Sequence, residues 1–487
     1  MNPQTLRFST SDTAIPFEKR LRLFPSSRFH VFPVFLCSDV AKSPHFIRSK
    51  HGVAAIRNCK DLVSSVSRRI DPISQREVGA PRVGKTVDIA TLGNLCVDIV
   101  LSVPSLPPTS ADEKRAYMEQ LSASRPDKKY WEAGGNCNLA IAAARVGLRC
   151  LTLGLVGDEI YGRFLVEVLG EEGIGMVKMN EDAETSASNG ISYETLRCWV
   201  LVDPLQRHGF CSIHDFSKEP AFGWLTMLSG QVKKAIGQSK ILFCNGYAYD
   251  ELSPDLILAA LEYARHVETA VFFDPGPRGK KLFCGSPQQQ RALKMYLKMS
   301  DVLLLTADEA ESLTGATNPI RAGQELIRES SHTRWVIIKM GSRGSLLVTK
   351  SSVSYAPAFK VDVVDTVGCG DSFTAAVAFG FLQNIPPMNT LVLANAVGGA
   401  TAMGCGAGRN VASLEKVIEL LKASDLNLEN FLGEKLVEDD LETDLVILSK
   451  SIPNGVGDKI KCVSVEKVVC DLMPRLQIKQ KGAMAPL

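Results

Sequence analysis

Short apolar segments that alternate with helical segments are the feature that most constrains how this chain can fold. The segments expected to be strands are 87–93, 150–156, 241–244, 270–273, 302–305 and 335–338. Helices are expected at 136–147 and near 254–265, 288–298, 308–314 and 322–329. Strands that alternate with helices form a mostly parallel sheet enclosed by helices. The sequence therefore predicts a three-layer α/β sandwich that begins near residue 86.

Two stretches, roughly 99–132 and 187–215, interrupt this alternation. The first is rich in proline, and the second contains patterns of exposed β-strands. Such strands can pair with each other as a small flap over the sheet edge, so we predict a β lid. The predicted parts of the chain are residues 1–85, a folded domain at 86–425 that includes the lid, and a C-terminal extension of unknown role at 426–487.

The first sixty residues are basic and rich in serine. They contain ten Lys and Arg residues against three Asp and Glu residues. This composition is typical of an organelle transit peptide, so we expect residues 1–85 to be a cleaved transit peptide and a linker. The abundance of serine favours the chloroplast, with the mitochondrion as the alternative. A disordered tail without a targeting role is the other interpretation of these residues.

The composition of the whole chain excludes several kinds of partner. A formal net charge of +2 provides no basic surface for direct nucleic-acid binding. The chain has no run of about eighteen apolar residues, so we expect no membrane span. The thirteen cysteines include no C-x-x-C pair, and the seven histidines show no ligand spacing. We therefore expect reduced cysteines, no transition metal, and a small molecule as the partner.

Residues 79–86 satisfy the spacing of a Walker A loop without its structural context. A working loop follows a strand and begins a helix, whose N-terminus faces the phosphates. Here a predicted strand comes after the motif, and Pro81 removes a backbone donor from the loop. We therefore interpret the match as a coincidence within a linker.

The segment Asp365-Thr-Val-Gly-Cys-Gly-Asp371 contains the residue types that bind phosphate. Its small residues let the backbone approach an anion, and the alanine-rich helix that follows points its first amides toward that anion. A purely structural aspartate here would repel phosphate, so Asp371 is better explained as a base that takes a proton from an attacking hydroxyl. An N-cap on a core helix would explain Asp371 alone. It would leave Asp365 and the glycine pair unexplained.

The pattern D-T-x-G-x-G-D before a small-residue helix resembles the C-terminal signature of the PfkB, or ribokinase-like, carbohydrate kinases. The resemblance extends over roughly residues 87–422 and includes further motifs in the expected order. It implies a ribokinase-like sandwich with a small β lid, in which Asp371 is the catalytic base. The anion hole is implied to consist of the backbone amides of Gly368, Cys369 and Gly370. The family usually has alanine in place of Cys369, and the transit-like N-terminus makes the chain similar to a plant organellar member.

The acceptor side of the resemblance lies near the start of the domain. Residues 133–147 are similar to the family's first signature, a glycine pair followed by asparagine and an alanine-rich helix. Ala133 replaces the usual first glycine, so the glycine pair is shifted by one residue. The residues that the resemblance assigns to substrate binding here are Gly134, Gly135 and Asn138.

Asp98 and Cys96 also match positions on the acceptor side. Asp98, five residues after Gly93, matches the aspartate that binds substrate hydroxyls in the family. A carboxylate can accept hydrogen bonds from both hydroxyls of a diol. Cys96 stands where ribokinases often have asparagine, which argues against ribose itself as the acceptor.

The nucleotide side is also similar to the family. Residues 301–315 resemble its N-x-x-E segment, with Thr306 in place of asparagine and Glu309 retained. Glu309 is therefore expected to hold hydrated magnesium indirectly. Residues 274–278 resemble the D-x-N-x-R strand end, without its asparagine. The residues assigned by resemblance to nucleotide binding are Lys339, Gly341, Gly344, Asn395 and Gly406.

The resemblance implies ATP as co-substrate, Mg²⁺ and a monovalent cation as cofactors, and a homodimer formed through the lid. The implied reaction is direct in-line transfer of the γ-phosphoryl group to a hydroxyl of a small sugar-like molecule. One alternative is a catalytically weak, kinase-like component of the plastid transcription apparatus. Another is a nucleoside kinase, which shares the chemistry and differs in the acceptor. The retention of Asp371 with the complete glycine loop favours an enzyme.

Overall fold

The computed structural model describes residues 84–180, 193–428, 443–449 and 460–483, apart from positions 109, 124, 206, 218 and 406. The chain divides into two units, Met1–Glu77 and Val78–Leu487. Every described residue belongs to the second unit. The transit peptide and linker predicted over residues 1–85 lie outside the described residues, apart from the last two positions.

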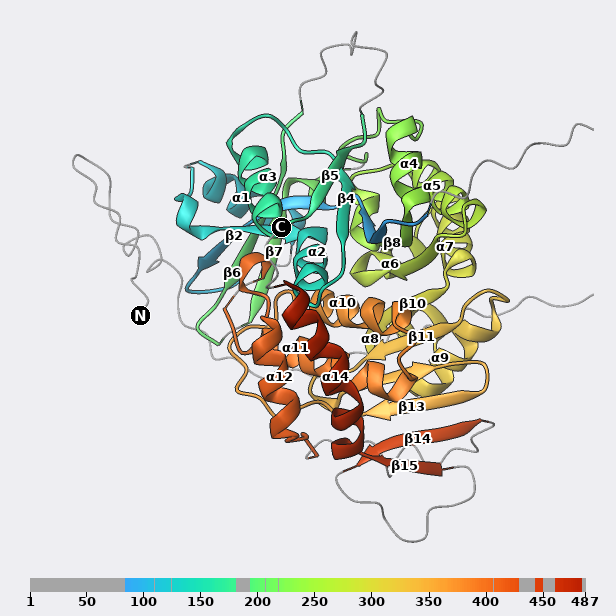
Figure 1. Cartoon of the computed structure of the whole chain (residues 1–487). Coiled ribbons are helices and arrows are strands. Elements are labelled where there is room, and N and C mark those ends of the chain that lie inside the picture. Colours follow the sequence, from blue (N-terminus) through green and yellow to red (C-terminus); the bar gives the residue numbers. More distant parts are fainter. Residues whose placement is uncertain are drawn as a thin grey trace, which may run out of the picture. The chain divides into compact units, whose positions relative to one another are not determined.

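A large sheet of eleven strands forms the centre of the described part of the chain (Figure 1). Its strands lie in the order β15-β14-β13-β12-β11-β10-β9-β8-β1-β4-β5. Neighbouring strands are parallel, except that β12 runs antiparallel to both β11 and β13. The strands are β1 (Val87–Leu92), β4 (Cys150–Gly154), β5 (Gly175–Lys178), β8 (Ser239–Asn245), β9 (Ala270–Asp274), β10 (Val302–Thr306), β11 (Trp335–Lys339), β12 (Ser345–Val348), β13 (Ser352–Ala356), β14 (Asp444–Ser449) and β15 (Ile460–Ser464). The predicted, mostly parallel sheet is confirmed.

Helices cover both faces of this sheet, because successive residues of its strands alternate between two buried faces. In β8, Ile241 and Phe243 pack into one core cluster, whereas Leu242 packs into the other. The first face is covered by α2 (Asn136–Arg145), α3 (Ile160–Glu171), α10 (Cys369–Leu382), α11 (Pro387–Ala402), α12 (Leu414–Ala423) and α14 (Val465–Ala483). The second is covered by α4 (Gly230–Gln238), α5 (Pro254–His266), α6 (Gly276–Phe283), α7 (Pro287–Met299), α8 (Ala307–Thr314) and α9 (Pro319–Arg328). The three-layer α/β sandwich is therefore confirmed.

A second, four-stranded sheet forms the predicted lid. Its order is β3-β2-β6-β7, and its strands are β2 (Leu95–Ser102), β3 (Trp131–Gly135), β6 (Leu196–Val202) and β7 (His208–Ser212). Ile99 and Trp199 belong to the same buried cluster as Met118 of α1 (Ala111–Ser122). The lid sheet begins earlier than the expected residue 99, because Gly93 and Asn94 turn the chain directly from β1 into β2 with left-handed backbone angles.

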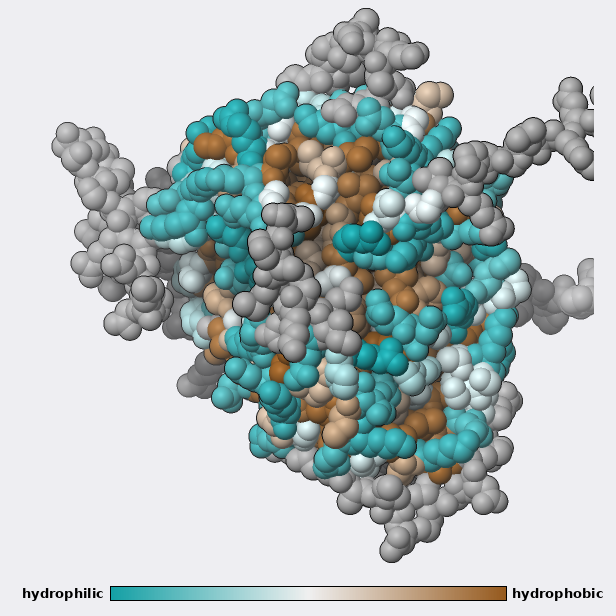
Figure 2. All heavy atoms as spheres, viewed as in Figure 1, coloured by the Kyte–Doolittle hydropathy of each residue, from teal (hydrophilic) through white to brown (hydrophobic). Residues whose placement is uncertain are grey.

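The face of the molecule in Figure 2 is largely hydrophilic, with apolar residues visible in patches between the polar ones. Large exposed apolar side chains such as Leu205 and Met227 are scattered over the sequence, as is usual for protein surfaces. Within the described ranges, no helix combines the length and the apolar character that a membrane crossing requires.

The Lys85 side chain contacts the amino-terminal ends of β8 and β9 and is not placed to bind a phosphate. β1 follows it directly, and its ammonium group donates to the Ser239 carbonyl at 2.8 Å and to the Thr269 hydroxyl at 2.6 Å. Ligand sites of open α/β sheets lie at the opposite, carboxyl ends of the strands. The structure therefore agrees with the rejection of the Walker A match.

The C-terminal extension adds two strands and a helix to the folded domain. β14 pairs with β13, and β15 pairs with β14, both in parallel (Figure 1). Helix α14 packs against α11 and α12. Leu448, Leu472 and Leu476 are fully buried in the core cluster on this side of the sheet. These elements are therefore part of the domain core, although the sequence offered no motif for them.

We predict that Leu472→Ala destabilises the whole domain, because it opens a cavity in this shared core. The Leu472 side chain is 0 % exposed, and such a truncation costs about 2–5 kcal/mol of unfolding free energy. Asp471→Ala, at an exposed position of the same helix, is the control and should leave the unfolding midpoint unchanged. Urea unfolding of the full chain measures both variants. A wild-type midpoint for Leu472→Ala would show that α14 does not stabilise the domain.

Candidate active site

Three parallel strands bring polar side chains to one edge of the large sheet, where open α/β folds bind their ligands. β9 ends at Asp274, β10 ends at Thr306 and β11 ends at Lys339. The Lys339 ammonium group lies 2.6 Å from a carboxylate oxygen of Asp274, and both side chains are 15 % exposed. This mostly buried ion pair forms the floor of the candidate site.

The predicted phosphate loop leads into α10 beside this ion pair. Gly368 is the N-cap of α10 and has a left-handed backbone (φ 76°), and a Cβ there would lie 2.7 Å from the Cβ of Ala407. Glycine avoids both the strain and the clash. A Cβ at Gly370 would lie only 3.7 Å from the Lys339 ammonium group. A helix N-terminus and a cation therefore stand together, which favours an anionic ligand.

Cys369 brings a neutral thiol to this loop. Burial raises the pKa of the Cys369 thiol to about 12, with smaller contributions from the charges of Asp365 and Asp371. The Cys369 backbone amide donates to the Thr366 carbonyl at 3.3 Å, inside the turn. An anion bound here would share this amide with Thr366, and the role of the loop amides as an anion hole stays a prediction.

Asp371 occupies the first turn of α10 and is poised to exchange a proton. Burial raises the pKa of Asp371 to about 6, and the charge of Asp274 adds to the rise, while Lys339 and a hydrogen bond from Asn138 oppose it. A carboxylate with this pKa is mostly ionised at pH 7 and can still accept a proton, as a general base must.

Asn138 of α2 connects Asp371 to the opposite wall of the site. Its side-chain Nδ2 donates to Oδ2 of Asp371 at 3.3 Å, and its Oδ1 accepts from the Gly408 amide at 2.7 Å. The second bond fixes the orientation of the amide group, because only the carbonyl oxygen can accept. Asn138 therefore holds Asp371 in place, and its contact with an acceptor stays a prediction.

Asp98 and the shifted glycine pair meet where β2 pairs with β3. Cys96 is the register partner of Gly134, and a Cβ on Gly134 would overlap the Asp98 carboxyl group. Gly134 therefore makes room for Asp98. Gly135 has a different role, because its left-handed backbone (φ 59°) starts α2, and a Cβ there would overlap the Asn94 carbonyl.

The Asp98 carboxyl group is 6 % exposed, and both its neutral and its ionised form are present at pH 7. Burial raises the pKa of Asp98 to about 7, the charges of Asp371 and Glu132 add to the rise, and a hydrogen bond from the Cys96 thiol opposes it. The Cys96 sulfur lies 3.5 Å from Oδ1 of Asp98. Asp98 can therefore donate as well as accept a hydrogen bond when an acceptor molecule binds.

Glu309 is fixed near the floor by a reciprocal cap of α8. The Thr306 amide donates to Oε2 of Glu309 at 2.8 Å, and the Glu309 amide donates to the Thr306 hydroxyl at 3.2 Å. Burial raises the pKa of Glu309, and the charge of Asp274 adds to the rise. Burial lowers the pKa of Lys339, but the charges of Asp274 and Glu309 outweigh this effect, and the pKa is raised.

The carboxylates of Asp274, Glu309 and Asp371 all interact with Lys339, and oxygen donors of this kind suit magnesium. Across the described ranges, no group of three or more His, Cys, Asp and Glu side chains is arranged to hold a metal ion directly. The residues present therefore fit magnesium that is held mainly by phosphate and water, and the indirect role of Glu309 stays a prediction.

The other residues predicted to bind nucleotide lie in the turn after β11 and on α11. Gly341 and Gly344 have left-handed backbones (φ 58° and 91°) in the turn between β11 and β12. Asn395 is engaged inside the protein, because its Oδ1 accepts from Ser345 at 2.9 Å and its Nδ2 donates to the Ala356 carbonyl at 3.0 Å. Asn395 therefore positions the end of β13, and its contact with nucleotide stays a prediction. Gly406 lies outside the described residues.

Sequence reasoning missed two residues of the site. Asp274 forms the ion pair with Lys339. The sequence feature that could have identified it is the D-x-N-x-R-like segment, of which Asp274 is the first residue. His208, on lid strand β7, has its Nε2 at 2.7 Å from Oδ1 of Asp365, the first aspartate of the phosphate loop. No local sequence pattern predicts this contact, because it depends on how the lid folds over the loop.

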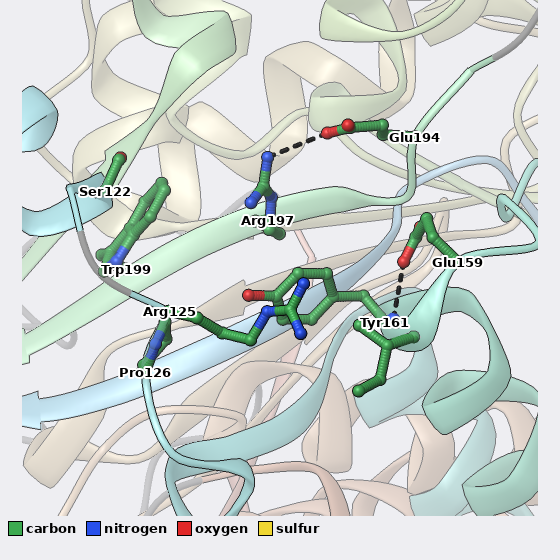
Figure 3. Close-up of a pocket in the computed structure, with 9 residues that line it drawn as sticks. Ser122, Arg125, Pro126, Glu159, Tyr161, Glu194, Arg197 and Trp199 are labelled. Atoms are coloured by element: carbon green, nitrogen blue, oxygen red, sulfur yellow. Dashed lines mark hydrogen bonds and ion pairs between the residues drawn. The ribbon is translucent and has the colours of Figure 1, made fainter.

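A cavity of about 280 Å³ lies elsewhere, on the lid side of α3 (Figure 3). Arg197 pairs with Glu194 at 3.0 Å there, and Glu159 accepts from the Tyr161 amide at 2.6 Å. None of the predicted site residues lines this cavity. We assign the active site to the cluster around Lys339 and Asp371.

A model of the pfkB family carbohydrate kinases matches residues 94–413. The chain belongs to this family. A 5-dehydro-2-deoxygluconokinase of Bacillus anthracis is 29 % identical over 326 residues, covering 65 % of this chain and 87 % of the relative. The 5-dehydro-2-deoxygluconokinase 2 of Bacillus cereus is 29 % identical over 327 residues, covering 65 % of this chain and 88 % of the relative.

Solved structures share the fold of this carbohydrate kinase. Arabidopsis thaliana ribokinase complexed with ribose and ATP has a TM-score of 0.53 and 20 % identity, and covers 69 % of this chain and 99 % of that chain. A putative ribokinase II from E. coli in complex with ATP and Mg²⁺ has a TM-score of 0.53 and 17 % identity, with the same coverage. The predicted ribokinase-like fold is confirmed.

The predicted family and the predicted enzyme class, a carbohydrate kinase, are therefore confirmed. The plant organellar type, the acceptor, the monovalent cation, the lid homodimer and the role of each site residue stay predictions. The structure places Gly134 against Asp98 and Asn138 against Asp371. It places Lys339 near Glu309 and Asp371.

We predict that Asn138→Ala raises the pKa of Asp371, because the hydrogen bond from Nδ2 stabilises the ionised carboxylate. A pH titration of the Asp371 carboxyl carbon by NMR measures the shift directly. Asn245→Ala is the matched control, because the Asn245 amide donates to Asn136 and not to Asp371. A titration midpoint that stays the same or falls in Asn138→Ala would contradict the prediction.

Proposed function

We propose that this kinase transfers the γ-phosphoryl group of ATP to a hydroxyl of a small sugar or sugar-like molecule, with Asp371 as the base. The observation that carries the proposal is the position of Asp371. It stands at the N-terminus of α10, has a pKa raised to about 6, and is held by Asn138 at 3.3 Å. A carboxylate at a helix N-terminus that also attracts phosphate is explained by a role in taking a proton.

The transfer follows from the arrangement of the site. Asp98 and Asn138 orient the acceptor, and Asp371 takes the proton of one hydroxyl as its oxygen attacks the γ-phosphorus. The bond between the γ-phosphorus and the bridging oxygen breaks, and ADP leaves. Lys339 and the amides of the loop at 368–370 stabilise the charge on the transferred group. No covalent enzyme intermediate is required.

The use of magnesium is supported by the fit of the carboxylates and by the E. coli structure, which contains ATP and Mg²⁺. When bound, magnesium would offset the negative charge of the phosphates. Glu309, capped on Thr306, is the residue proposed to orient its water molecules. The lid contact between His208 and Asp365 supports closure of the lid over the site, which excludes water as a competing acceptor.

The acceptor is proposed only as a class. The matched relatives are named 5-dehydro-2-deoxygluconokinases, and solved structures of the same fold include an adenosine kinase of Sinorhizobium meliloti. Cys96 beside Asp98 gives this acceptor site a thiol in contact with the carboxyl group. These features support a sugar or a sugar-like molecule without selecting one compound.

We predict that the purified full chain phosphorylates at least one member of a panel of hexoses, pentoses, inositols and nucleosides with Mg-ATP. Asp371→Asn should lower kcat by about 10²-fold or more, because the base is removed. ATP binding, measured by calorimetry, should persist in this variant. Unimpaired turnover by Asp371→Asn would refute the base assignment, and silence across the whole panel would favour a non-enzymatic role.

We also propose that the protein acts in the chloroplast, on the basis of the basic, serine-rich first sixty residues. A fusion of residues 1–85 to a fluorescent protein should enter chloroplasts of plant cells and be shortened on import. Accumulation in mitochondria would support the alternative compartment. A fusion that stays in the cytosol at full length would contradict a transit peptide.

A further inference from the structure

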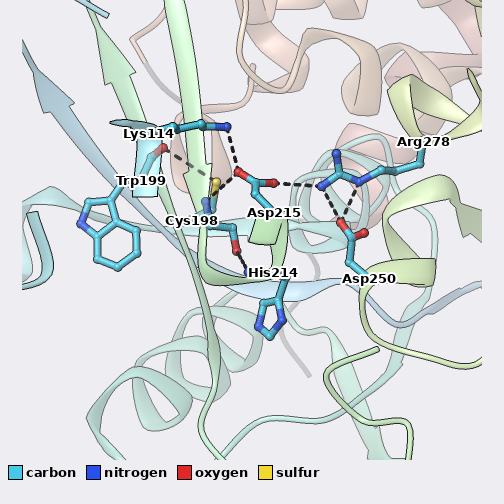
Figure 4. Close-up of polar contacts among 8 residues, drawn as sticks. Lys114, Cys198, Trp199, His214, Asp215, Asp250 and Arg278 are labelled. Atoms are coloured by element: carbon cyan, nitrogen blue, oxygen red, sulfur yellow. Dashed lines mark hydrogen bonds and ion pairs between the residues drawn. The ribbon is translucent and has the colours of Figure 1, made fainter. Parts of the chain in front are cut away.

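Charged side chains attach the lid to the rest of the domain, and one attachment is a chain of ion pairs (Figure 4). Asp215, in the short helix η4 (Ile213–Phe216) after lid strand β7, lies between two cations. Its Oδ2 is 2.9 Å from the Lys114 ammonium group, and its Oδ1 is 3.1 Å from the Arg278 guanidinium group. Nε of Arg278 also donates to Oδ2 of Asp250 at 2.8 Å.

Another attachment joins lid strand β3 to the short helix η7 (Gly408–Asn410) through Arg409. Nε of Arg409 donates to Oε2 of Glu132 at 3.1 Å, and Nη2 donates to Oε1 of Glu132 at 3.1 Å. Nη2 also donates to the Trp131 carbonyl at 3.1 Å. The Glu132 side chain is only 13 % exposed. A two-point contact between a guanidinium group and a carboxylate fixes both direction and distance, so Arg409 holds η7 firmly against the lid.

Gly408 lies directly against the same strand. It has a left-handed backbone (φ 59°), and a Cβ there would lie 2.7 Å from the Ala133 carbonyl oxygen. The Gly408 amide donates to Oδ1 of Asn138, on α2, at 2.7 Å. Arg145 of the same helix donates through Nη2 to the Arg409 carbonyl at 3.0 Å. The short helix η7 is therefore held between β3 and α2.

Asn138 extends this set of contacts to Asp371. The oxygen of its amide group accepts from Gly408, and the nitrogen of the same group donates to Oδ2 of Asp371 at 3.3 Å. An amide group that is fixed at its oxygen also has its nitrogen fixed, because the group is planar and only the nitrogen can donate. The position of Gly408 therefore decides where the donor to Asp371 points.

The charge of Arg409 is not what reaches Asp371. The charged groups that act on the pKa of Asp371 are Asp274 and Lys339, at the ends of β9 and β11. The charge of Arg409 is offset by that of Glu132 at 3.1 Å. An effect of Arg409 on Asp371 therefore has to pass through the hydrogen bonds of η7 and α2.

We propose that Arg409 is a positioning residue that couples lid strand β3 to the proposed base, by holding Gly408 where its amide orients Asn138. The inference rests on the proposed function, because it concerns the base of the same reaction. Arg409 takes no part in the proton transfer. If the end of β3 leaves η7, the hydrogen bond from Asn138 to Asp371 is released, so the base is fully oriented only when this part of the lid is docked.

The test titrates Asp371 by NMR in the full chain, with the spectrum of Asp371→Asn to assign its carboxyl signal. Arg409→Met removes the contacts with β3 and keeps the length of the side chain. Because Asn138 then stabilises the ionised carboxylate less well, the titration midpoint of Asp371 should rise. With the acceptor identified by the substrate panel, kcat should fall about tenfold while KM for ATP stays within about threefold.

A double-mutant cycle tests whether Arg409 acts through Glu132. Glu132→Gln weakens the same ion pair from the β3 side and should also raise the midpoint of Asp371. Combined with Arg409→Met it should add little, because the contact is already lost. Arg409→Lys keeps the charge and should have a smaller effect than Arg409→Met. If Arg409→Met does not fold, Glu132→Gln carries the test.

Asp215→Asn is the control for a lid that is merely loosened. It breaks the ion pairs of Figure 4, which include neither Gly408 nor Asn138. It should not raise the titration midpoint of Asp371. An equal rise in Asp215→Asn would show that any loosening of the lid changes Asp371, and it would overturn the route through Arg409.

The remaining outcomes separate this inference from the proposed function. A folded Arg409→Met with the wild-type midpoint would overturn the coupling, and so would effects of Arg409→Met and Glu132→Gln that simply add. A raised midpoint in Arg409→Met, together with a wild type that phosphorylates no acceptor, would support the coupling and contradict the proposed transfer. An unchanged midpoint with normal turnover of the wild type would contradict the coupling alone.

Discussion

The buried ammonium group of Lys339 is the charge on which the rest of the site depends. An unpaired cation at this depth would cost several kcal/mol, and the carboxylate of Asp274 at 2.6 Å makes its burial tolerable. Glu309 and Asp371 also interact with Lys339, so the local charge is negative overall. Burial raises the pKa of Glu309 and of Asp371, the charge of Asp274 adds to both rises, and Lys339 opposes them. Burial of this ion pair beside Asp371 thus helps to set the pKa of the proposed base.

Much of the fold could be predicted, because it depends on patterns within short segments of the sequence. Strands buried on both faces are continuous apolar runs, and β8, β10 and β11 were found for that reason. The phosphate loop was recognisable because Gly368 must adopt a left-handed backbone in a crowded position. The glycine pair was harder to interpret from its spacing alone. The structure separates its members, since Gly134 makes room for Asp98 and Gly135 turns the chain into α2.

The rest could not be predicted, because it depends on contacts between distant segments. β14 and β15 carry charged residues and no motif. β14 pairs with β13 across a long interval of chain, and β15 pairs with β14. The contact of His208 with Asp365 and the ion pairs of Asp215 arise only when the lid is placed over the domain. Asn395 was predicted to bind nucleotide. In the structure its side chain donates to the carbonyl of Ala356, the last residue of β13. A side chain's position in a motif does not reveal which partner it will use.

The two added strands, β14 and β15, also change which strand forms the edge of the large sheet. Without them β13 would end the sheet, and its row of unpaired amides and carbonyls would be open to any other extended chain. With them, that border passes to the five-residue strand β15. Its Lys461 side chain is 64 % exposed and paired with Asp444 at 2.8 Å. A short border strand with an exposed lysine is a common natural defence against aggregation between sheets. The extension thus moves the open edge of the sheet from β13 to β15, where an exposed lysine disfavours pairing with a second sheet.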